Sequence, residues 1–155
     1  MSGILVIRLR SDIHVRTDMS DTMKFLNLTR VNHATIVPDN PVTRGMLRKV
    51  KDWVTFGAVD AATAAELLQK RGRLEGNKPV TDAFLKENSD HASIQAYAEA
   101  LASGKARLGD VPGMKPLFRL APPRQGHEGI KHSFRSHGAL GDRGEAIGAL
   151  ATRMV

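Results

Sequence analysis

The first 57 residues alternate between strand-like and helix-like spacings of apolar residues. The apolar stretch at residues 4–10 predicts a strand, with one face formed by Leu5, Ile7 and Leu9 and the other by Ile4, Val6, Arg8 and Arg10. Short apolar runs at 34–37 and 53–56 predict two further strands, the second stopped by Gly57. Between the strands, apolar residues recur every three or four positions, which predicts two helices, the first ending near Leu28. The predicted order is therefore strand, helix, strand, helix, strand.

Polar residues that can cap helices precede both helical patterns. Thr17 or Asp18 can cap the first helix, and Asn40 or Thr43 can cap the second, where Pro41 suits the first turn. We expect the two helices to pack on one face of the sheet. The apolar stripes that would face it are Met19, Met23 and Leu26 on the first helix and Val42, Met46, Leu47 and Val50 on the second.

The second helix carries a row of cations. At about 100° per residue, the side chains of Arg44, Arg48 and Lys51 fall within an arc of roughly 60° that faces away from the apolar stripe. Such a row suits the phosphates of a polyanion, because each neutralised phosphate releases condensed counterions. It equally suits a helix face that is merely solvated. Spacing alone leaves both interpretations open.

The rest of the chain is first helical and then irregular. Residues 58–104 are Ala-rich, and helices can open at Asp60, at Thr81 or Asp82, and at Ser93. The apolar stretch 117–120 is long enough for one added strand.

Residues 121–141 are rich in Pro and Gly and carry cations and histidines against one acid, Glu128. We expect this irregular segment to gain order by lying on phosphates. The spacing of Asp142 and Glu145 predicts a capping box for a last helix over 142–154, whose apolar stripe is Ile147, Leu150 and Met154.

Charge points to a polyanionic partner. The chain has a net charge of +7 and a pI near 10.1. Residues 1–57 and 111–155 each carry +4, whereas residues 58–110 carry −1. This distribution predicts two nucleic-acid-facing segments that flank a solvent-facing insert. Aromatic residues make up only 5% of the chain, so base stacking is not expected to dominate RNA binding.

Three segments resemble one protein family. VNHATIVPDNPVTRGMLRKVKDWVTFG at 31–57 resembles the core segment of the L-thirty family of large-subunit ribosomal proteins, whose eukaryotic relatives are called L-seven. PPRQGHEGIKH at 122–132 resembles a Pro-Pro-Arg-Gly-Gly-His and Gly-Ile-Lys-His segment of archaeal members, with Gln125 in place of Gly and Ser133 in place of Pro. GDRGEAIGALATRM at 141–154 resembles the terminal helix of eukaryotic members.

The resemblance implies an α+β protein. We expect a ferredoxin-like domain over 1–57, with a three-stranded antiparallel sheet and two helices, an α-helical insert over 58–110, and a strand, an extended basic segment and a helix over 111–155. It further implies a cytoplasmic structural protein of the large ribosomal subunit, whose partners are large-subunit rRNA and neighbouring ribosomal proteins. Neither a catalytic residue, a metal, a cofactor, a small-molecule substrate nor a membrane is expected. The expected RNA-binding residues are Arg10, His14, Arg30, His33, Arg44, Arg48, Lys49, Lys51, Arg124, His127, Lys131, His132 and Arg135.

Two other classes of protein remain open at this point. A free-standing RNA-binding regulatory module would use the same charges. A metalloenzyme could use His127, His132 and His137, together with His14 and His33, since imidazole is a good zinc ligand. Their five-residue period suits neither a helix face nor a strand face, the chain has no Cys, and phosphate-loop and nucleophile motifs are missing, which favours the ribosomal interpretation.

Overall fold

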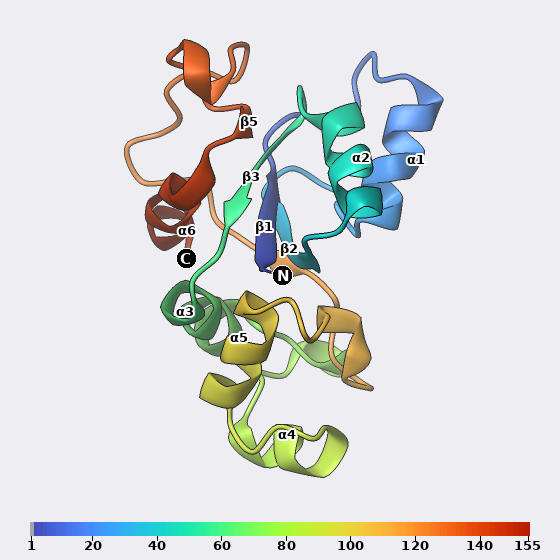
Figure 1. The fold of residues 1–155 in the computed structure, drawn as a ribbon, viewed down its shortest axis with the longest axis vertical. Coiled ribbons are helices and arrows are strands. Elements are labelled where there is room, and N and C mark those ends of the chain that lie inside the picture. Colours follow the sequence, from blue (N-terminus) through green and yellow to red (C-terminus); the bar gives the residue numbers. More distant parts are fainter. Residues whose placement is uncertain (1) are drawn as a thin grey trace.

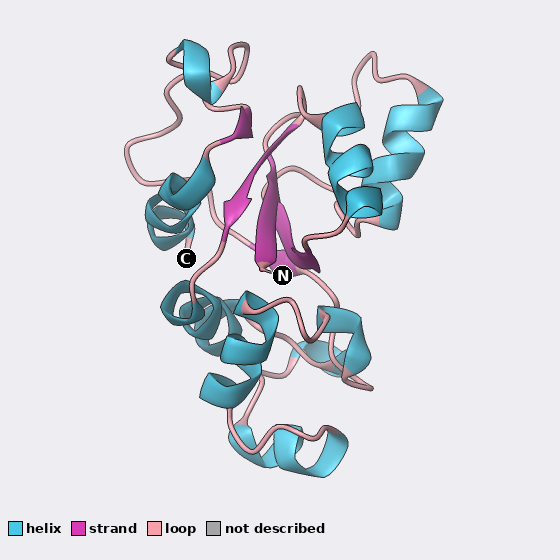
Figure 2. Cartoon of the chain, in the orientation of Figure 1, coloured by secondary structure: helices cyan, strands magenta, loops and turns pink. Residues whose placement is uncertain are grey.

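The computed structural model describes residues 2–155 and has a mixed five-stranded sheet at its centre (Figures 1 and 2). The sheet has the order β4-β2-β1-β3-β5 and consists of β1 (Gly3–Arg8), β2 (His33–Pro38), β3 (Val54–Ala58), β4 (Phe118–Arg119) and β5 (Gly141–Asp142). The α-helices are α1 (Thr17–Phe25), α2 (Pro41–Val50), α3 (Ala61–Arg71), α4 (Asp82–Asn88), α5 (Ile94–Ala102) and α6 (Ile147–Met154).

The three central strands are antiparallel, as the family resemblance implied for residues 1–57. β1 lies between β2 and β3, so that Leu5 pairs with Ile36 on one side and with Gly57 on the other. The sheet is nevertheless larger than three strands. The stretch 117–120 supplies β4, which pairs antiparallel with β2, and the C-terminal segment supplies β5, which pairs parallel with β3 and was not predicted.

Helices cover both faces of the sheet, because alternate residues of β1 are apolar on both sides. Ile4 and Val6 pack with residues of α1 and α2, whereas Leu5, Ile7 and Leu9 pack with residues of α3, α5 and α6. The helices of residues 58–110 therefore do not stand apart in solvent. They supply many side chains of the larger core cluster, for example the fully buried side chains of Tyr97 and Leu101.

The end of β1 corrects one prediction. The strand stops at Arg8 instead of Arg10, and the Arg8 side chain, predicted to share a face with Arg10, is buried. Its guanidinium donates to the carbonyl oxygens of Arg10 and Leu28 and pairs with Asp12. A long side chain can be buried in this way because its polar end finds partners inside the protein.

Helix ends agree with the predicted caps in part. Asn40 caps α2 and Ser93 caps α5, as predicted, but α1 follows Arg16, which makes no side-chain cap hydrogen bond. The same helix ends at Phe25, earlier than predicted, because Asn27 has a left-handed φ of 60° that stops the helix.

The C-terminal helix also begins later than predicted. Asp142 belongs to β5, and its carboxylate accepts from the amide of Gly144, so no capping box forms with Glu145. A 3-10 turn precedes α6, and its Gly144 carbonyl lies so close to Gly57 that a Cβ at position 57 would collide with it. Ile147 and the rest of the predicted apolar stripe are buried, as expected.

Candidate nucleic-acid interface

The predicted row of cations lies on the flank of α2. The Asn40 side chain accepts from the amide of Thr43 at 2.7 Å and so fixes where the helix starts. The residues that α2 buries are Thr43, Leu47 and Val50, whereas Val42, predicted to be buried, is 73% exposed. The buried face is therefore about 100° around the helix from the cations, not opposite them. This rotation tilts the cations over the sheet.

A groove of about 760 Å³ runs between α2 and the C-terminal segment. Arg44, Arg48 and Lys51 line one wall, Arg135 lies on the other wall, and Phe56 of β3 is among the residues between them. Residues separated by 84 positions or more in the sequence therefore bring their positive charges to one hollow. Two acids, Asp39 and Asp142, also line the groove and keep it from being uniformly cationic.

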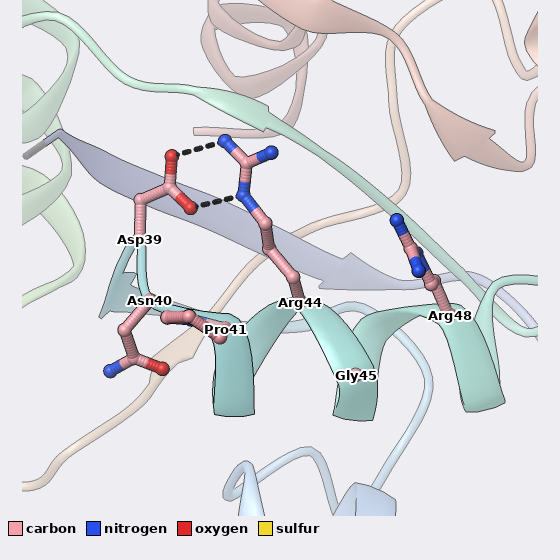
Figure 3. A pocket seen from close by; sticks show the side chains of 6 residues that line it. All are labelled: Asp39, Asn40, Pro41, Arg44, Gly45 and Arg48. Carbon is pink, nitrogen blue, oxygen red and sulfur yellow. Dashed lines mark hydrogen bonds and ion pairs between the residues drawn. The ribbon is translucent and has the colours of Figure 1, made fainter.

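Arg44 is held by a carboxylate at the start of α2 (Figure 3). Two of its guanidinium nitrogens donate to Asp39, with Nη2 2.6 Å from Oδ2. This contact lowers the pKa of Asp39 and raises that of Arg44, so both groups are charged. In the described chain neither Arg48 nor Lys51 forms a salt bridge. Their charges are therefore available to an anion without displacing a carboxylate.

Three other predicted RNA-binding residues of the N-terminal part lie away from the groove. Lys49 points to the other side of α2 and pairs with Asp18 of α1 at 3.5 Å. The Arg10 guanidinium lies over the Trp53 ring, 5.6 Å from its centroid. His14 is exposed in the connection before α1. All three residues were expected to bind RNA, and the fold places them on surfaces away from the groove.

Arg30 and His33 lie at the opposite edge of the sheet, where β2 pairs with β4. Burial lowers the pKa of His33, and the nearby guanidinium groups of Arg119, Arg30 and Arg8 lower it further. The neutral imidazole has its Nδ1 3.1 Å from the Thr29 hydroxyl. Sequence reasoning missed Arg119, whose position opposite His33 follows only from the β2–β4 register.

The C-terminal segment presents most of its predicted cations to solvent. Arg124, Lys131, His132 and Arg135 are exposed, whereas His127 is half-buried. The Nδ1 atom of His127 is buried and has no hydrogen-bond partner within residues 2–155. Burial and the neighbouring Arg143 lower its pKa, so His127 is less easily charged than a free histidine.

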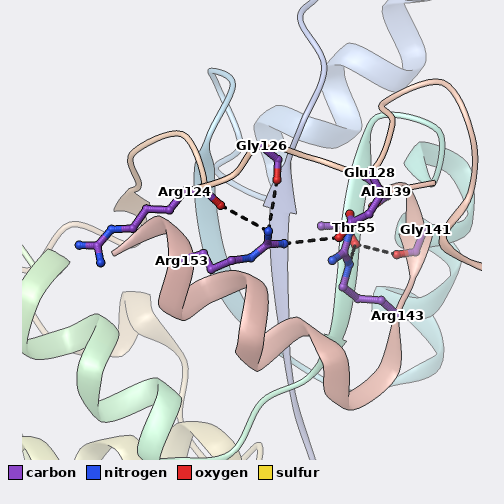
Figure 4. A network of polar contacts seen from close by, with 8 residues as sticks. All are labelled: Thr55, Arg124, Gly126, Glu128, Ala139, Gly141, Arg143 and Arg153. Atoms are coloured by element: carbon purple, nitrogen blue, oxygen red, sulfur yellow. Dashed lines mark hydrogen bonds and ion pairs between the residues drawn. The ribbon is translucent and has the colours of Figure 1, made fainter. Parts of the chain in front are cut away.

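A buried network holds this segment in place without RNA (Figure 4). The Arg143 side chain is 3% exposed. Its guanidinium donates to the Thr55 hydroxyl at 2.9 Å and to the Ala139 carbonyl at 2.8 Å, and it lies 5.0 Å from the centroid of the Phe134 ring. Glu128, the single acid of the segment, lies 3.8 Å from this guanidinium. The segment expected to order on phosphates thus has an internal support that the sequence did not reveal.

Arg153 of α6 secures the other end of the segment. It donates to the carbonyl oxygens of Arg124 and Gly126, and it lies 3.5 Å from the carboxylate of Glu128. Gln125, which stands where archaeal members are expected to have Gly, has a left-handed φ of 69°. The backbone therefore keeps a conformation that glycine adopts more readily.

Across residues 2–155, no three His, Asp or Glu side chains gather in a way that could hold a metal ion. None of the helices in the described part of the chain is long and apolar enough to cross a membrane.

Comparison with known proteins gives a consistent result. Residues 4–54 match the family described as "Ribosomal protein L30p/L7e". The chain is 44% identical over 149 residues to the protein named "Large ribosomal subunit protein uL30" of Methanocella arvoryzae, covering 96% of this chain and 97% of the relative. It is 46% identical to the protein of the same name of Methanoregula boonei, with the same coverage, and 46% identical to that of Methanopyrus kandleri, covering 95% of this chain and 100% of the relative. Similarity of this extent shows that the chain belongs to the uL30 family of large-subunit ribosomal proteins.

Proposed function

We propose that this chain is a structural constituent of the large ribosomal subunit of an archaeal-type ribosome, in the cytoplasm, and that it binds large-subunit rRNA. Relatives that carry this name match it over nearly their whole length. Its partners are the rRNA and the neighbouring ribosomal proteins. Its role is to hold RNA in place, and no chemical step is involved.

The observation that carries RNA binding is the groove between α2 and the C-terminal segment. Its walls bear Arg44, Arg48, Lys51 and Arg135, and within residues 2–155 only Arg44 among these four is engaged with a carboxylate. Cations arranged along a hollow of this kind neutralise phosphates at fixed positions. Such contacts position the protein, whereas RNA shape and 2′-hydroxyl groups provide recognition.

The three segments then take different roles. The sheet and helices of residues 1–57 form a ferredoxin-like domain that binds RNA. The insert of residues 58–110 covers the second face of the sheet, and residues 111–155 add a basic loop. On that loop Arg124, Lys131, His132 and Arg135 are exposed and free to reach phosphates. Because the network around Arg143 already orders the loop, little conformational entropy is lost when it binds.

The other expected RNA-binding residues contribute less under this proposal. Lys49 is already paired with Asp18, so a phosphate must displace a carboxylate there. His33 and His127 have lowered pKa values and would act as neutral hydrogen-bonding groups. Arg10 and His14 lie apart from the groove and would need a second RNA contact.

Sedimentation of a tagged copy in cell lysate tests the proposal. We expect the protein to run with large subunits at low salt and to stay with them at moderate salt. The variant Arg48→Gln/Lys51→Gln should release from subunits at lower salt, whereas Lys78→Gln/Lys86→Gln, which removes the same charge from the insert, should behave as the wild type. A protein that remains at the top of the gradient at every salt concentration would refute the ribosomal assignment and favour a free-standing RNA-binding module.

A further inference from the structure

A second group of cations lies at the β4 edge of the sheet. The group consists of three arginines, Arg30, Arg71 and Arg119, together with the neutral imidazole of His33, and we call it the β4-edge cluster. His33 and Arg119 are paired residues of β2 and β4, and Arg71 at the end of α3 donates to the Arg119 carbonyl at 3.3 Å. Arg30 lies three residues before His33, the first residue of β2, and its carbonyl accepts from the amide of His33 at 3.2 Å.

The cluster has no counter-charge of its own. No salt bridge in residues 2–155 involves Arg30, Arg71 or Arg119. The nearest buried cation, Arg8, is already paired with Asp12. The groups that perturb His33 are all arginines, together with burial, and no carboxylate is among them. The cluster therefore gathers repulsive charges, and a polyanion would turn this repulsion into attraction.

The β4-edge cluster is separate from the groove. β4 is one edge strand of the sheet, whereas the groove is bounded by β3 and by β5, the other edge strand. Four spacings between neighbouring strands put β4 and β5 about 19 Å apart. This exceeds the Debye length of about 8 Å at physiological ionic strength, so charges at the two edges act on different parts of a ligand.

We infer that the β4-edge cluster is a second phosphate-binding surface, which holds a different segment of large-subunit rRNA from the one in the groove. The inference rests on the proposed function and extends it: the protein bridges two RNA segments across the width of its sheet. Arg71 and Arg119, which the sequence did not single out, become RNA contacts. Arg30 and His33 gain a place in the interface that the groove does not offer them.

Charged residues on an edge strand have another known use, which is to prevent edge-to-edge pairing between molecules. The two explanations predict different results. Edge protection predicts that removal of the arginines causes aggregation and leaves RNA affinity per monomer unchanged. The bridging inference predicts that affinity and its salt dependence fall while the protein stays monomeric.

Binding of the full-length protein to archaeal large-subunit rRNA made by transcription, measured over a range of salt concentrations, tests the inference. Three variants are compared: the edge variant Arg30→Gln/Arg71→Gln/Arg119→Gln, the groove variant Arg48→Gln/Lys51→Gln, and the control Lys78→Gln/Lys86→Gln/Arg107→Gln. Each phosphate contact that is lost reduces the magnitude of the slope of log affinity against log salt by about one. This magnitude should therefore fall by about two to three in the edge variant and by about two in the groove variant.

The combined edge and groove variant should show the sum of both losses, because distant sites contribute additively. A variant with Lys at the three edge positions should have the salt slope of the wild type. In each single Gln variant the magnitude of the slope should fall by about one. These variants keep the test valid even if the triple Gln variant folds poorly. If the edge variant binds like the control while the groove variant is weakened, the bridging inference is wrong and the proposed function stands. If the wild type shows no salt-dependent binding, the proposed function itself fails.

Discussion

Replacement of Arg143 by Met separates order in the C-terminal segment from contact with RNA. Arg143 is buried, so its guanidinium cannot touch a phosphate, yet it joins β3 to the segment that carries the exposed cations (Figure 4). Methionine has a similar length and no charge. The variant therefore removes the support and leaves every exposed cation in the sequence.

The expected loss of stability follows from the contacts of the guanidinium. Its two hydrogen bonds, to Thr55 and Ala139, are charge-assisted and contribute about 3–5 kcal/mol together. Its position over the Phe134 ring adds about 1–2 kcal/mol. About 2–3 kcal/mol of this loss is offset, because the variant no longer has to remove a charged guanidinium from water. The net cost is about 3 kcal/mol, or roughly 6–12 °C in the melting temperature of a domain of this size.

Thermal unfolding and hydrogen exchange measure the two consequences. The amides of Gly138 and Ala139, which donate to carbonyls within the segment, should exchange faster in Arg143→Met. Affinity for rRNA should fall while its salt slope stays that of the wild type, because no phosphate contact is lost. Arg135→Met is the matched control, since it should lower the slope and leave the melting temperature unchanged. An unchanged melting temperature and unchanged exchange in Arg143→Met would refute the reasoning.

Three further predictions concern single side chains. Gln125→Gly should raise the free energy of unfolding by up to about 1 kcal/mol in denaturant melts, because glycine adopts the left-handed backbone at this position with less strain. As a control, Gln95→Gly within α5 should lower the free energy of unfolding by a similar amount. Asp39→Asn should steepen the salt slope of rRNA binding by about one, because it frees Arg44, and an unchanged slope would mean that Arg44 does not reach phosphate. The pKa of His127 in the folded protein lies below its ordinary value of 6.5, so the unfolded chain binds a proton at this side chain more readily. The free energy of unfolding of the wild type should therefore fall as the pH drops below 6.5. Denaturant unfolding at several pH values should show a weaker fall in His127→Gln.

Local spacing was sufficient to predict much of the fold. The alternation in β1 correctly assigned Leu5 and Ile7 to one face and Ile4 and Val6 to the other, because a strand places successive side chains on opposite sides. Caps such as Asn40 were found because a short polar side chain before an apolar pattern has a specific hydrogen-bonding role. Both signals depend only on residues that are close together in the sequence, so they can be recognised without knowledge of the fold.

Errors arose where a distant partner decides the outcome. Val42 fits the helical stripe, but α2 is turned so that Thr43 is buried in its place, and only the packing on the sheet sets that rotation. The sequence around Asp142 predicts a helix start, whereas Asp142 pairs with Phe56 and belongs to β5. The one local hint of the buried network was Glu128, an isolated acid in a basic segment. Predicted RNA-binding residues were chosen by charge, so their division between the groove, the β4 edge and other surfaces required the fold.

The bridging inference assigns the packed insert a part in RNA binding. The groove and the β4-edge cluster lie on opposite edges of one sheet, and both faces of that sheet are buried, the second by α3, α5 and α6. A ligand held at two sites gains most when the distance between the sites is fixed to match its own, because the second contact then forms at a high effective concentration. The bridging inference therefore gives the insert a role in RNA binding, which is to keep the two cationic edges at a constant separation, although its own charge is slightly negative.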